Sequence, residues 1–411
     1  MTGHVTNCRM CDSANLLKFL DLGSMPPADR FLQQNQLTDI EERYPLEVLS
    51  CLDCGLAQLS YVVPPEILFC QAYPYEASTT ATACQHWAEF AESTWSKLLL
   101  ARNDLVVDIG SNVGVLLEAF NHKGARVVGV DPAANMADIA NGLGRATIPA
   151  FFDEDVARRI VHAKGQASII TGTNVFAHID DLNGFMRAVE ILLKPEGTLV
   201  IESPHFMALV ENLLYDTIYH EHLSYLSVKP LIKFFAKFGM QIWDIQRQSN
   251  HGESFRYFVG RGPGWVRPDR VTEILRQEAQ AGIYDPAVLK HFAVRVEKNR
   301  RDLRTLLLEV KDQGSRIAAI SAPAKGMTLL NYCGLGSEVL DFVTEKARLK
   351  IGRYTPGTQI PVVSDDMLRE QPPDYALLLA WNFAEEIMGN LKAVMHNSKF
   401  IIPLPSPQIV N

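Results

Sequence analysis

The pattern of hydrophobic positions changes sharply about a quarter of the way along the chain. From Asp104 onward, short apolar runs alternate with helical patterns, and the runs read LVVDIG, RVVGVD, ASIITGTNV and GTLVIES. This alternation is typical of a parallel sheet with helices on both faces. Ligands of such sheets bind beyond the carboxyl ends of the strands, so the residues after each run are the candidates for chemistry.

A second region of the same kind lies nearer the carboxyl terminus. After a helical stretch from Arg267 to Lys311, strand and helix patterns alternate again in RIAAISAPAKGMTLLNYCG, VLDFVTE and ALLLAW. We expect a second, smaller α/β unit there. Its turn APAKG follows a strand and opens a helix, so backbone amides, the helix dipole and Lys325 can together hold a diphosphate. A plain capped turn is the alternative.

Composition narrows the class of protein. The chain has 411 residues, of which 47% are hydrophobic, so it can bury a large core and fold as a globular protein. Its formal net charge of -8 argues against a surface built for nucleic acid. The densest basic run, Arg295 to Arg304, contains acids and is interpreted as a solvated helix face.

The start of the chain and its cysteines suggest a reducing compartment. MTGHVTNCRMC lacks a secretory signal, and no run approaches the roughly 20 apolar residues that span a bilayer, so we expect a cytoplasmic protein without a membrane partner. Disulfides are then improbable. For three of the seven cysteines, which have no partner at ligand spacing, we expect core packing: Cys70, Cys84 and Cys333.

The other cysteines form two C-x-x-C pairs, Cys8 with Cys11 and Cys51 with Cys54. Two such loops can supply four thiolates at tetrahedral corners, which predicts one zinc ion. Four sulfur ligands leave no position for water, so this zinc is expected to be structural. The alternative is that these are unrelated core cysteines.

The first apolar run ends in a glycine loop. Asp108, Gly110 and Gly114 follow the order D-x-G-x-x-x-G, and Asp131 ends the next run about 20 residues later. The glycines permit a tight turn and close approach of a ligand, and a carboxylate at the second strand end can accept hydrogen bonds from ribose hydroxyls. The spacing differs from the dinucleotide fingerprint. The glycine loop, the acid at the second strand end and the strand order together favour an adenosyl cofactor; ordinary strand-ending turns are the alternative, and NAD is the nearest rival cofactor. Asn174, which ends a later run, is expected to line the methionine moiety.

A dense group of titratable side chains follows the run GTLVIES. Tyr219, His220, Glu221, His222 and Tyr225 occupy seven positions between apolar stretches. Imidazole can take a proton from a carbon next to a carbonyl, and a neighbouring carboxylate or phenol can orient it or donate to the enolate oxygen. This pattern favours methylation at carbon, which requires such a base. A hydrogen-bonded strut between domains is the alternative.

These segments together resemble the sugar C-methyltransferase family, which methylates C-3 of nucleotide-linked 4-keto deoxysugars. The matching stretches are CRMC with CLDCGLAQL, DLGSMPPADRF, YPYEAS, VVDIGSNVG, NVFAHI, IYHEHLSY, SAPAKGMTLLNYCG, GRYTPGTQIPV and LAWNFAEEI. The resemblance implies an α/β protein: a class I methyltransferase Rossmann-like domain flanked by a small zinc-binding domain and a second Rossmann-like α/β domain. We place these at residues 71–265, 1–70 and 266–411, respectively.

The resemblance also assigns roles to residues. It implies S-adenosylmethionine as cofactor, with Asp108 near its methionine end, and His222 as the base. Tyr219 and Glu221 would assist His222, while His178, in NVFAHI, would line the sugar pocket; a satisfied buried histidine is the alternative for His178. We place further residues at the substrate site, namely Tyr73, Tyr75, Lys325 and His251. HGESFR, at His251 to Arg256, departs from the family pattern and puts the sugar preference in doubt.

The expected substrate is a thymidine diphosphate sugar, with a guanosine nucleotide as the alternative. The resemblance implies deprotonation at C-3 followed by methylation of the enolate, with inversion at that carbon. Two other classes remain open: a zinc-ribbon methyltransferase or adaptor that binds RNA, and a scaffold that holds the cofactor without turnover.

Overall fold

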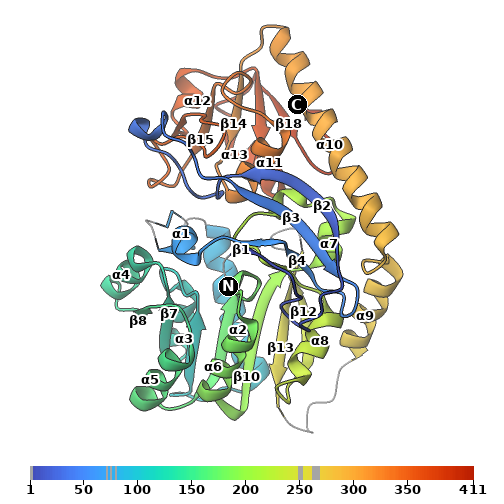
Figure 1. The fold of residues 1–411 in the computed structure, drawn as a ribbon. Helices are drawn as coiled ribbons and strands as arrows, with labels where there is room; N and C mark the ends of the chain where they lie inside the picture. Colours follow the sequence, from blue (N-terminus) through green and yellow to red (C-terminus); the bar gives the residue numbers. More distant parts are fainter. Residues whose placement is uncertain (1–2, 71–72, 75, 79–80, 249–252, 262–268) are drawn as a thin grey trace.

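The computed structural model describes residues 3–70, 73–74, 76–78, 81–248, 253–261 and 269–411. Tyr75 and His251, both expected at the substrate site, lie outside the described residues. Figure 1 shows three layers of chain: a lower lobe around one sheet, an upper lobe around another, and the N-terminal segment between them.

The lower lobe is built on a seven-stranded sheet in the order β12-β13-β10-β9-β6-β7-β8. Strands β6 to β10 are parallel, and β13 runs antiparallel to both β10 and β12. Its strands are β6 (Leu105–Ile109), β7 (Arg126–Asp131), β8 (Thr147–Pro149), β9 (Ala167–Thr173), β10 (Leu193–Pro204), β12 (Gln241–Gln248) and β13 (Ser254–Gly260). Every residue of β6 is buried, as the continuous apolar run requires of a central parallel strand.

Helices accompany the strands of this sheet, which confirms the predicted alternation. They are α2 (Ala81–Leu98), α3 (Val115–His122), α4 (Ala134–Gly142), α5 (Glu154–Lys164), α6 (Leu182–Leu192), α8 (Val228–Ala236) and α9 (Asp269–Ala281). Several short elements lie near the carboxyl edge of the sheet or lead into it. They are α1 (Pro65–Phe69), η2 (Phe176–His178), α7 (Phe206–Glu211) and η3 (Tyr215–Thr217).

The N-terminal segment forms a four-stranded sheet in the order β11-β4-β3-β2. Three of its strands come from the segment itself: β2 (Leu16–Met25), β3 (Tyr44–Cys51) and β4 (Ala57–Leu59). The edge strand β11 (Ser224–Tyr225) comes from the chain just after the YHEH run and pairs antiparallel with β4. A separate two-stranded ribbon pairs β1 (Gly3–His4) with β5 (Tyr61–Val62). The N-terminal sheet is therefore completed by the middle of the chain.

The upper lobe confirms the second α/β unit. Its six-stranded sheet has the order β16-β15-β14-β17-β18-β19, parallel except for β19. The strands are β14 (Ile317–Ile320), β15 (Phe342–Glu345), β16 (Val362–Ser364), β17 (Tyr375–Leu378), β18 (Lys399–Ile402) and β19 (Gln408–Val410), and the helical elements are α11 (Ala324–Cys333), α12 (Met367–Glu370), η5 (Trp381–Phe383) and α13 (Ala384–Leu391).

A long helix, α10 (Pro286–Asp312), runs along one side of the molecule from the lower lobe to the upper one (Figure 1). Its buried residues recur at three- and four-residue spacing, as on one face of a helix. They are Leu289, Phe292, Val296, Asn299, Leu303, Leu307 and Val310. Within the basic run, Lys298 and Arg301 are solvated as predicted and pair with Asp302 and Glu297 at exposed i, i+4 positions. The two ends of the run are not: Arg295 donates to the carbonyl of Val210, and Arg304 to that of Cys333.

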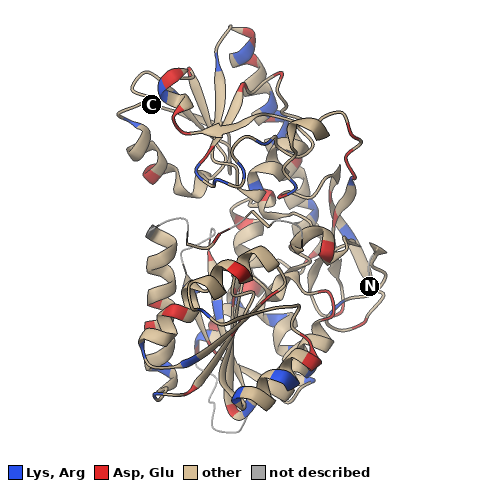
Figure 2. Ribbon diagram, turned by 90° about the vertical axis from the view of Figure 1, so that its left-hand side faces the viewer, with Lys and Arg blue, Asp and Glu red and all other residues tan. Residues whose placement is uncertain are grey.

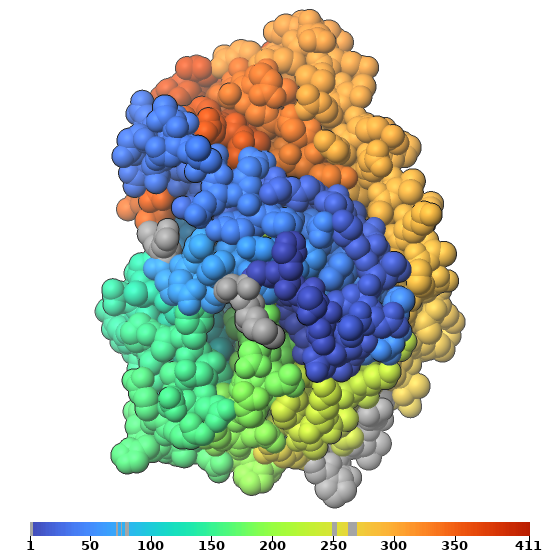
Figure 3. All heavy atoms as spheres, viewed as in Figure 1, coloured from blue at the N-terminus to red at the C-terminus, as the bar shows by residue number. Residues whose placement is uncertain are grey.

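The N-terminal segment packs against both lobes. Leu20, Leu46 and other residues of its sheet share one core with the upper lobe, whereas three of the C-x-x-C cysteines, Cys8, Cys51 and Cys54, belong to the core of the lower lobe. Figure 3 shows the segment seated between the two lobes on one face of the molecule. Two opposite faces of this small segment are thus buried, which offsets its limited capacity to form a core of its own.

Charges of both signs are interspersed over the helices of the two lobes (Figure 2). Among the described residues, no helix is both long and apolar enough to cross a lipid bilayer. All seven cysteines are free. Cys333 is buried, as predicted, but the expectation of core packing was wrong for Cys70 and Cys84, which are exposed. The first follows the end of α1 and the second lies on α2, and an apolar residue type alone does not show which face of an element it occupies.

Candidate active site

The two C-x-x-C pairs meet at one point. Cys8 Sγ lies 3.5 Å from Cys54 Sγ, and Cys11 Sγ lies 3.5 Å from Cys51 Sγ. All four sulfurs lie within 4.8 Å of one another. Thiolates about 2.3 Å from a tetrahedral zinc ion are about 3.8 Å apart, so the cluster fits that ion. Four sulfurs complete its coordination, which suits a structural role.

The glycine loop after β6 is closed by a carboxylate of the next strand. Asp131 accepts hydrogen bonds from the backbone amides of Asn112, at 2.7 Å, and Ala133, at 2.9 Å. Gly110 has φ +68°, and a Cβ there would lie 2.2 Å from Cγ2 of Val175. Only glycine fits this turn. Each carboxylate oxygen of Asp131 keeps a lone pair for a further donor, such as a ribose hydroxyl.

Two further polar side chains lie at this edge of the sheet, Asp108, which has a raised pKa, and Asn174, whose amide oxygen is unpartnered among the described residues. Burial raises the pKa of Asp108 to about 7, and the nearby charge of Asp131 adds to this, while a hydrogen bond from Thr171 at 2.6 Å opposes it. Asn174 has φ +55°, and its buried amide oxygen has no hydrogen-bond partner among the described residues. Gly114 has φ +76° where α3 begins. This donor and acceptor set fits a nucleoside joined to an amino acid.

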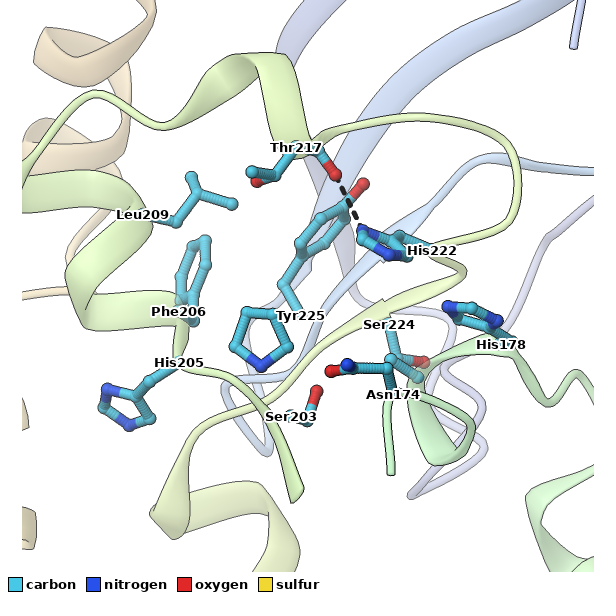
Figure 4. Close-up of a pocket in the computed structure, with 12 residues that line it drawn as sticks. Asn174, His178, Ser203, His205, Phe206, Leu209, Thr217, His222, Ser224 and Tyr225 are labelled. Carbon is cyan, nitrogen blue, oxygen red and sulfur yellow. Dashed lines mark hydrogen bonds between the residues drawn. The ribbon is translucent and has the colours of Figure 1, made fainter. Parts of the chain in front are cut away.

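A pocket lies beside this edge, between β10 and the YHEH run (Figure 4). Figure 4 shows His222 and His178 on one side of it, Phe206 and Leu209 on the other, and Tyr225 between them. Its wall is therefore apolar on one side and titratable on the other. The lining residues are Asn174, Ala177, His178, Ser203, Pro204, His205, Phe206, Leu209, Thr217, His222, Ser224 and Tyr225.

The hydrogen bond made by His222 fixes the state of its ring. Nδ1 of His222 lies 2.7 Å from the backbone oxygen of Thr217 (Figure 4). A carbonyl oxygen can only accept, so Nδ1 carries the proton. In the neutral ring the other nitrogen, Nε2, is then the basic one. The ring of Tyr219 lies against this imidazole with its centroid 3.9 Å away, which restricts the ring further.

His178 lies next to His222, with the two ring centroids 5.0 Å apart. It also stacks on Phe69, at 5.9 Å and an interplanar angle of 10°. Burial lowers the pKa of His178 well below its usual value, and the charge of His222 lowers it further. Its Nε2 has no hydrogen-bond partner among the described residues, so the structure does not support the alternative of a satisfied core histidine.

Glu221 is buried where three segments of the chain meet. Tyr73 donates a hydrogen bond of 3.2 Å to its carboxylate. Burial raises the pKa of Glu221 to about 8, and the charge of Asp29 contributes, while Tyr73 and Lys350 oppose the shift. A carboxyl group with this pKa is protonated at neutral pH and can donate a hydrogen bond. Its neighbours come from PPADRF and from KIGRYTPG, which are far apart in the sequence.

Asp29 and Lys350 were not among the predicted site residues. The amine of Lys350 is buried, lies 3.0 Å from the carboxylate of Asp29 and donates to the carbonyl of Ala322. Lys350 is therefore a buried cation rather than part of a solvated loop. A signal existed in PPADRF, where a single acid interrupts an otherwise largely apolar motif.

Of the YHEH run, His222 lines the pocket, whereas His220 contacts the N-terminal sheet. Nε2 of His220 lies 3.2 Å from the backbone oxygen of Tyr44, and burial lowers the pKa of His220 to about 4. His220 therefore acts as a neutral strut to the N-terminal sheet. Two lining residues that the sequence did not single out as substrate contacts, Ser224 and Tyr225, have buried hydroxyls with no partner in the described part of the chain.

Lys325 lies at the carboxyl end of the second sheet, as the sequence predicted. Its amine contacts the amide oxygen of Asn382 and lies 4.6 Å from the ring centroid of Trp381. Burial lowers the pKa of Lys325, and the charge of Asp216 opposes this. Asp216 in turn accepts a 2.7 Å hydrogen bond from the indole of Trp381. The amine is thus held where the upper lobe meets η3, and phosphate contact stays a prediction.

Comparison with known families agrees with this architecture. Three family models match the chain: a zinc binding domain at residues 8–69, a methyltransferase domain at 84–245, and the C-methyltransferase C-terminal domain at 249–405. The methyltransferase match decides between a methyl donor and NAD in favour of S-adenosylmethionine, and the zinc model coincides with the four-cysteine cluster.

Individual relatives differ in how much of the chain they cover. C-methyltransferase NovU of Streptomyces niveus is 37% identical over 99% of this chain and 97% of its own. Ubiquinone biosynthesis O-methyltransferase of Bordetella avium is 33% identical over only 22% of this chain and 39% of its own. Magnesium protoporphyrin IX methyltransferase of Synechocystis, solved with its methyl donor, is 15% identical, covers 44% of this chain and 82% of its own, and has a TM-score of 0.33.

NovU matches nearly the whole chain, and the three family models together span all its domains, so these matches assign a family to the entire chain. The O-methyltransferase matches only one part of the chain. The protein belongs to the C-methyltransferase family, in which a zinc-binding domain and a C-terminal domain flank an S-adenosylmethionine-dependent methyltransferase domain.

Proposed function

We propose that this C-methyltransferase acts at C-3 of a nucleotide-linked 4-keto deoxysugar, and that His222 is the base. The observation that carries the proposal is the 2.7 Å hydrogen bond from Nδ1 of His222 to Thr217, which leaves Nε2 as the basic nitrogen of a residue lining the pocket. A hydrogen on the carbon beside a ketone is acidic enough for imidazole to remove when the enolate is stabilised.

The chemistry follows from charge and geometry. His222 takes the C-3 proton, the electron pair of that bond forms an enolate with the C-4 oxygen, and C-3 then bonds to the transferred methyl carbon as the carbon–sulfur bond breaks. Bound S-adenosylmethionine supplies the electrophilic methyl group. In-line transfer from the face opposite the departing proton gives inversion at C-3. The products are the methylated ketone and the thioether form of the cofactor.

Neighbouring residues have separable roles in this proposal. Glu221, whose pKa is raised to about 8 chiefly by burial, is neutral near pH 7 and can donate to the developing oxyanion directly or through Tyr73. Tyr219 holds the imidazole plane, and His178, neutral because burial lowers its pKa, faces the same pocket.

The rest of the substrate would reach the C-terminal domain. Lys325 is the proposed diphosphate contact, the nucleotide is thymidine diphosphate with a guanosine nucleotide as the alternative, and Asp108, Asp131 and Asn174 hold the cofactor. The domain limits proposed are 1–70, 71–265 and 266–411, with α9 of the last range packed on the sheet of the lower lobe. Support for this arrangement comes from the cation at the strand end beside η3 and from the matched C-terminal domain.

Exchange of the C-3 hydrogen tests the base. In heavy water with S-adenosylhomocysteine bound, wild-type enzyme should wash deuterium into C-3 of a 4-keto nucleotide sugar, and His222→Ala should lose both exchange and methylation. His220→Gln is the matched control, because His220 faces Tyr44, and it should keep both activities. Exchange by His222→Ala at the wild-type rate would refute the assignment.

The same substrates separate the other classes of function. Incubation with labelled S-adenosylmethionine and a panel of 4-keto nucleotide sugars should give a mass gain of one methylene on one of them. A scaffold that only holds the cofactor would give no mass gain with any sugar. An RNA-binding methyltransferase would instead label RNA and bind it with a steep dependence on salt.

A further inference from the structure

Arg9 lies inside the first cysteine loop, between the ligands Cys8 and Cys11, yet its side chain is used elsewhere. It is 8% exposed. Its Nε donates to the carboxylate of Asp180 at 3.2 Å, and its Nη1 donates to the carbonyls of Leu223 at 3.0 Å and Leu59 at 3.3 Å. One buried guanidinium therefore joins three segments of the chain.

Two of these segments carry the histidines of the pocket. Asp180 follows His178 by two residues, and Leu223 follows His222 directly. The two histidine rings lie 5.0 Å apart. Since Arg9 bonds to both segments, the relative placement of the two rings depends on the guanidinium as well as on local packing.

A second connection runs through the N-terminal sheet. The cysteine loop of Cys51 and Cys54 leads into β4, whose Ala57 and Gln58 pair with Tyr225 and Ser224 of β11. The backbone amide of Arg9 donates to the side chain of Gln58 at 2.9 Å. The metal cluster thus supports β4, and β4 supports the strand that begins two residues after the proposed base.

We propose that Arg9 is a positioning residue that holds the segments of His178 and His222 in their productive relation, so that the zinc-binding cluster supports catalysis as well as folding. The inference rests on the proposed function for the role of His222. Guanidinium suits this task because its planar array of donors can serve several acceptors at fixed angles, whereas an ammonium group is a point charge.

The alternative is that Arg9 only stabilises the contact between domains and does not affect catalysis. A second cation provides the matched control, because Lys237, at the end of α8, donates to the backbone carbonyl of Met10 at 2.5 Å in the same cysteine loop. Among the described residues, Lys237 donates a hydrogen bond to this loop and to neither histidine segment. If Arg9 only joins the domains, removing Arg9 or Lys237 should have similar effects on kcat. If Arg9 positions the histidines, only the loss of Arg9 should lower kcat.

The experiment compares Arg9→Ala, Arg9→Lys and Lys237→Ala in the full chain. Arg9→Ala should lower kcat by about 10- to 100-fold, since small misplacement of reacting groups has effects of that size. Its KM for S-adenosylmethionine and its zinc content should stay within about twofold of wild type. Arg9→Lys should not recover kcat, whereas tens of millimolar guanidinium added to Arg9→Ala should recover part of it. Lys237→Ala should keep kcat within about twofold.

Wild-type kcat in Arg9→Ala, or an equal loss in Lys237→Ala, would overturn the proposal. If Arg9→Ala loses zinc or does not fold, Asp180→Asn decides, because it changes the acceptor from the opposite side and leaves the cysteine loop intact. Asp180→Asn should lower kcat about three- to tenfold with unchanged zinc content, and wild-type kcat would count against Arg9. The two proposals fail separately. Recovery of methylation by guanidinium would support the role of Arg9 even if His222→Ala still exchanged the C-3 hydrogen, a result that would refute only the base assignment.

Discussion

The first turns of the two parallel sheets are built in the same way but carry different groups. β6 ends in the lower lobe and is followed by Gly110; β14 ends in the upper lobe and is followed by Ser321. Both residues have φ +68°. In each sheet the next strand, β7 or β15, lies parallel beside the first and ends in an acid. The same backbone device thus opens both crossovers.

Each of the two acids accepts a hydrogen bond from a backbone amide of the turn that follows the first strand. Asp131 accepts from the amide of Asn112, in the turn after β6. Glu345 accepts from the amide of Ala322, in the turn after β14, at 2.9 Å, and from two amides of its own turn. A carboxylate at the second strand end is therefore part of the architecture of such a turn, and alone it does not identify a ribose site.

What differs is the charge around each turn. Two residues before Gly110 stands Asp108, whereas two residues before Ser321 stands Ala319. The helix after the first turn begins beyond a glycine, and α11 begins beyond Pro323 with Lys325 in its first turn. The first strand end therefore carries two acids, Asp108 and Asp131, whereas the second carries one acid, Glu345, and the amine of Lys325. Ligand choice follows from a few side chains placed on a common backbone.

The largest expected effect comes from removing each acid in turn. Asp131→Ala should weaken binding of S-adenosylmethionine by about 100-fold or more, because it loses ribose contacts and frees the glycine loop; a charge-assisted hydrogen bond contributes about 1.5 to 3 kcal/mol. Glu345→Ala should leave this affinity within about twofold. Calorimetric titration of both variants measures the contrast. Equal losses would show that the two turns are not functionally distinct.

A smaller effect, dependent on pH, should distinguish Asp108 from its counterpart Ala319. Burial raises the pKa of Asp108 to about 7, so below pH 7 the cofactor-free protein holds this carboxyl neutral. An ionised carboxylate attracts the cationic cofactor and a neutral one does not. Affinity for S-adenosylmethionine should therefore rise by about tenfold from pH 6 to pH 8 and level off above.

The sign of the accompanying stability change is opposite. Because the pKa of Asp108 is higher in the folded chain than the unfolded value of about 3.9, its contribution to the stability of the cofactor-free protein is complete below pH 4. That contribution is lost as pH rises toward 7. Asp108→Asn should abolish both trends, as measured by titration and thermal unfolding at several pH values. A variant that kept the wild-type pH dependence of affinity would exclude Asp108 as its source.

The sequence predicted the parts of this comparison that depend on local pattern. Both alternations of strand and helix, the four cysteines and the loop of Gly110 follow from spacing, because tight turns and metal sites demand particular residues at fixed intervals. The sequence did not predict that Glu345 repeats the role of Asp131, since its three amide contacts depend on how two strands end beside each other.

Other features escaped prediction because they join distant segments. Asp29 and Lys350 are 321 residues apart and form a buried pair. Arg9 contacts the carbonyl of Leu223, 214 residues away. No periodicity or spacing reports contacts of this kind. The YHEH run was identified by its density of titratable groups. The family resemblance, and not the pattern of residues, singled out His222, which lines the pocket.

The smallest expected effect tests whether the positive φ angle of Ser321 destabilises the folded chain, as the same angle at Gly110 does not. A residue with a Cβ loses roughly 1 to 2 kcal/mol in the left-handed region, and glycine does not, although glycine also gains freedom in the unfolded chain. Ser321→Gly should therefore raise the free energy of unfolding by about 0.5 kcal/mol, with Ser321→Ala, which keeps the Cβ, giving no gain. Denaturant unfolding of the cofactor-free protein measures the difference. A loss of 1 kcal/mol or more in Ser321→Gly would mean that the serine hydroxyl, and not the backbone, holds the second turn, and the likeness between the two turns would then end at their φ angles.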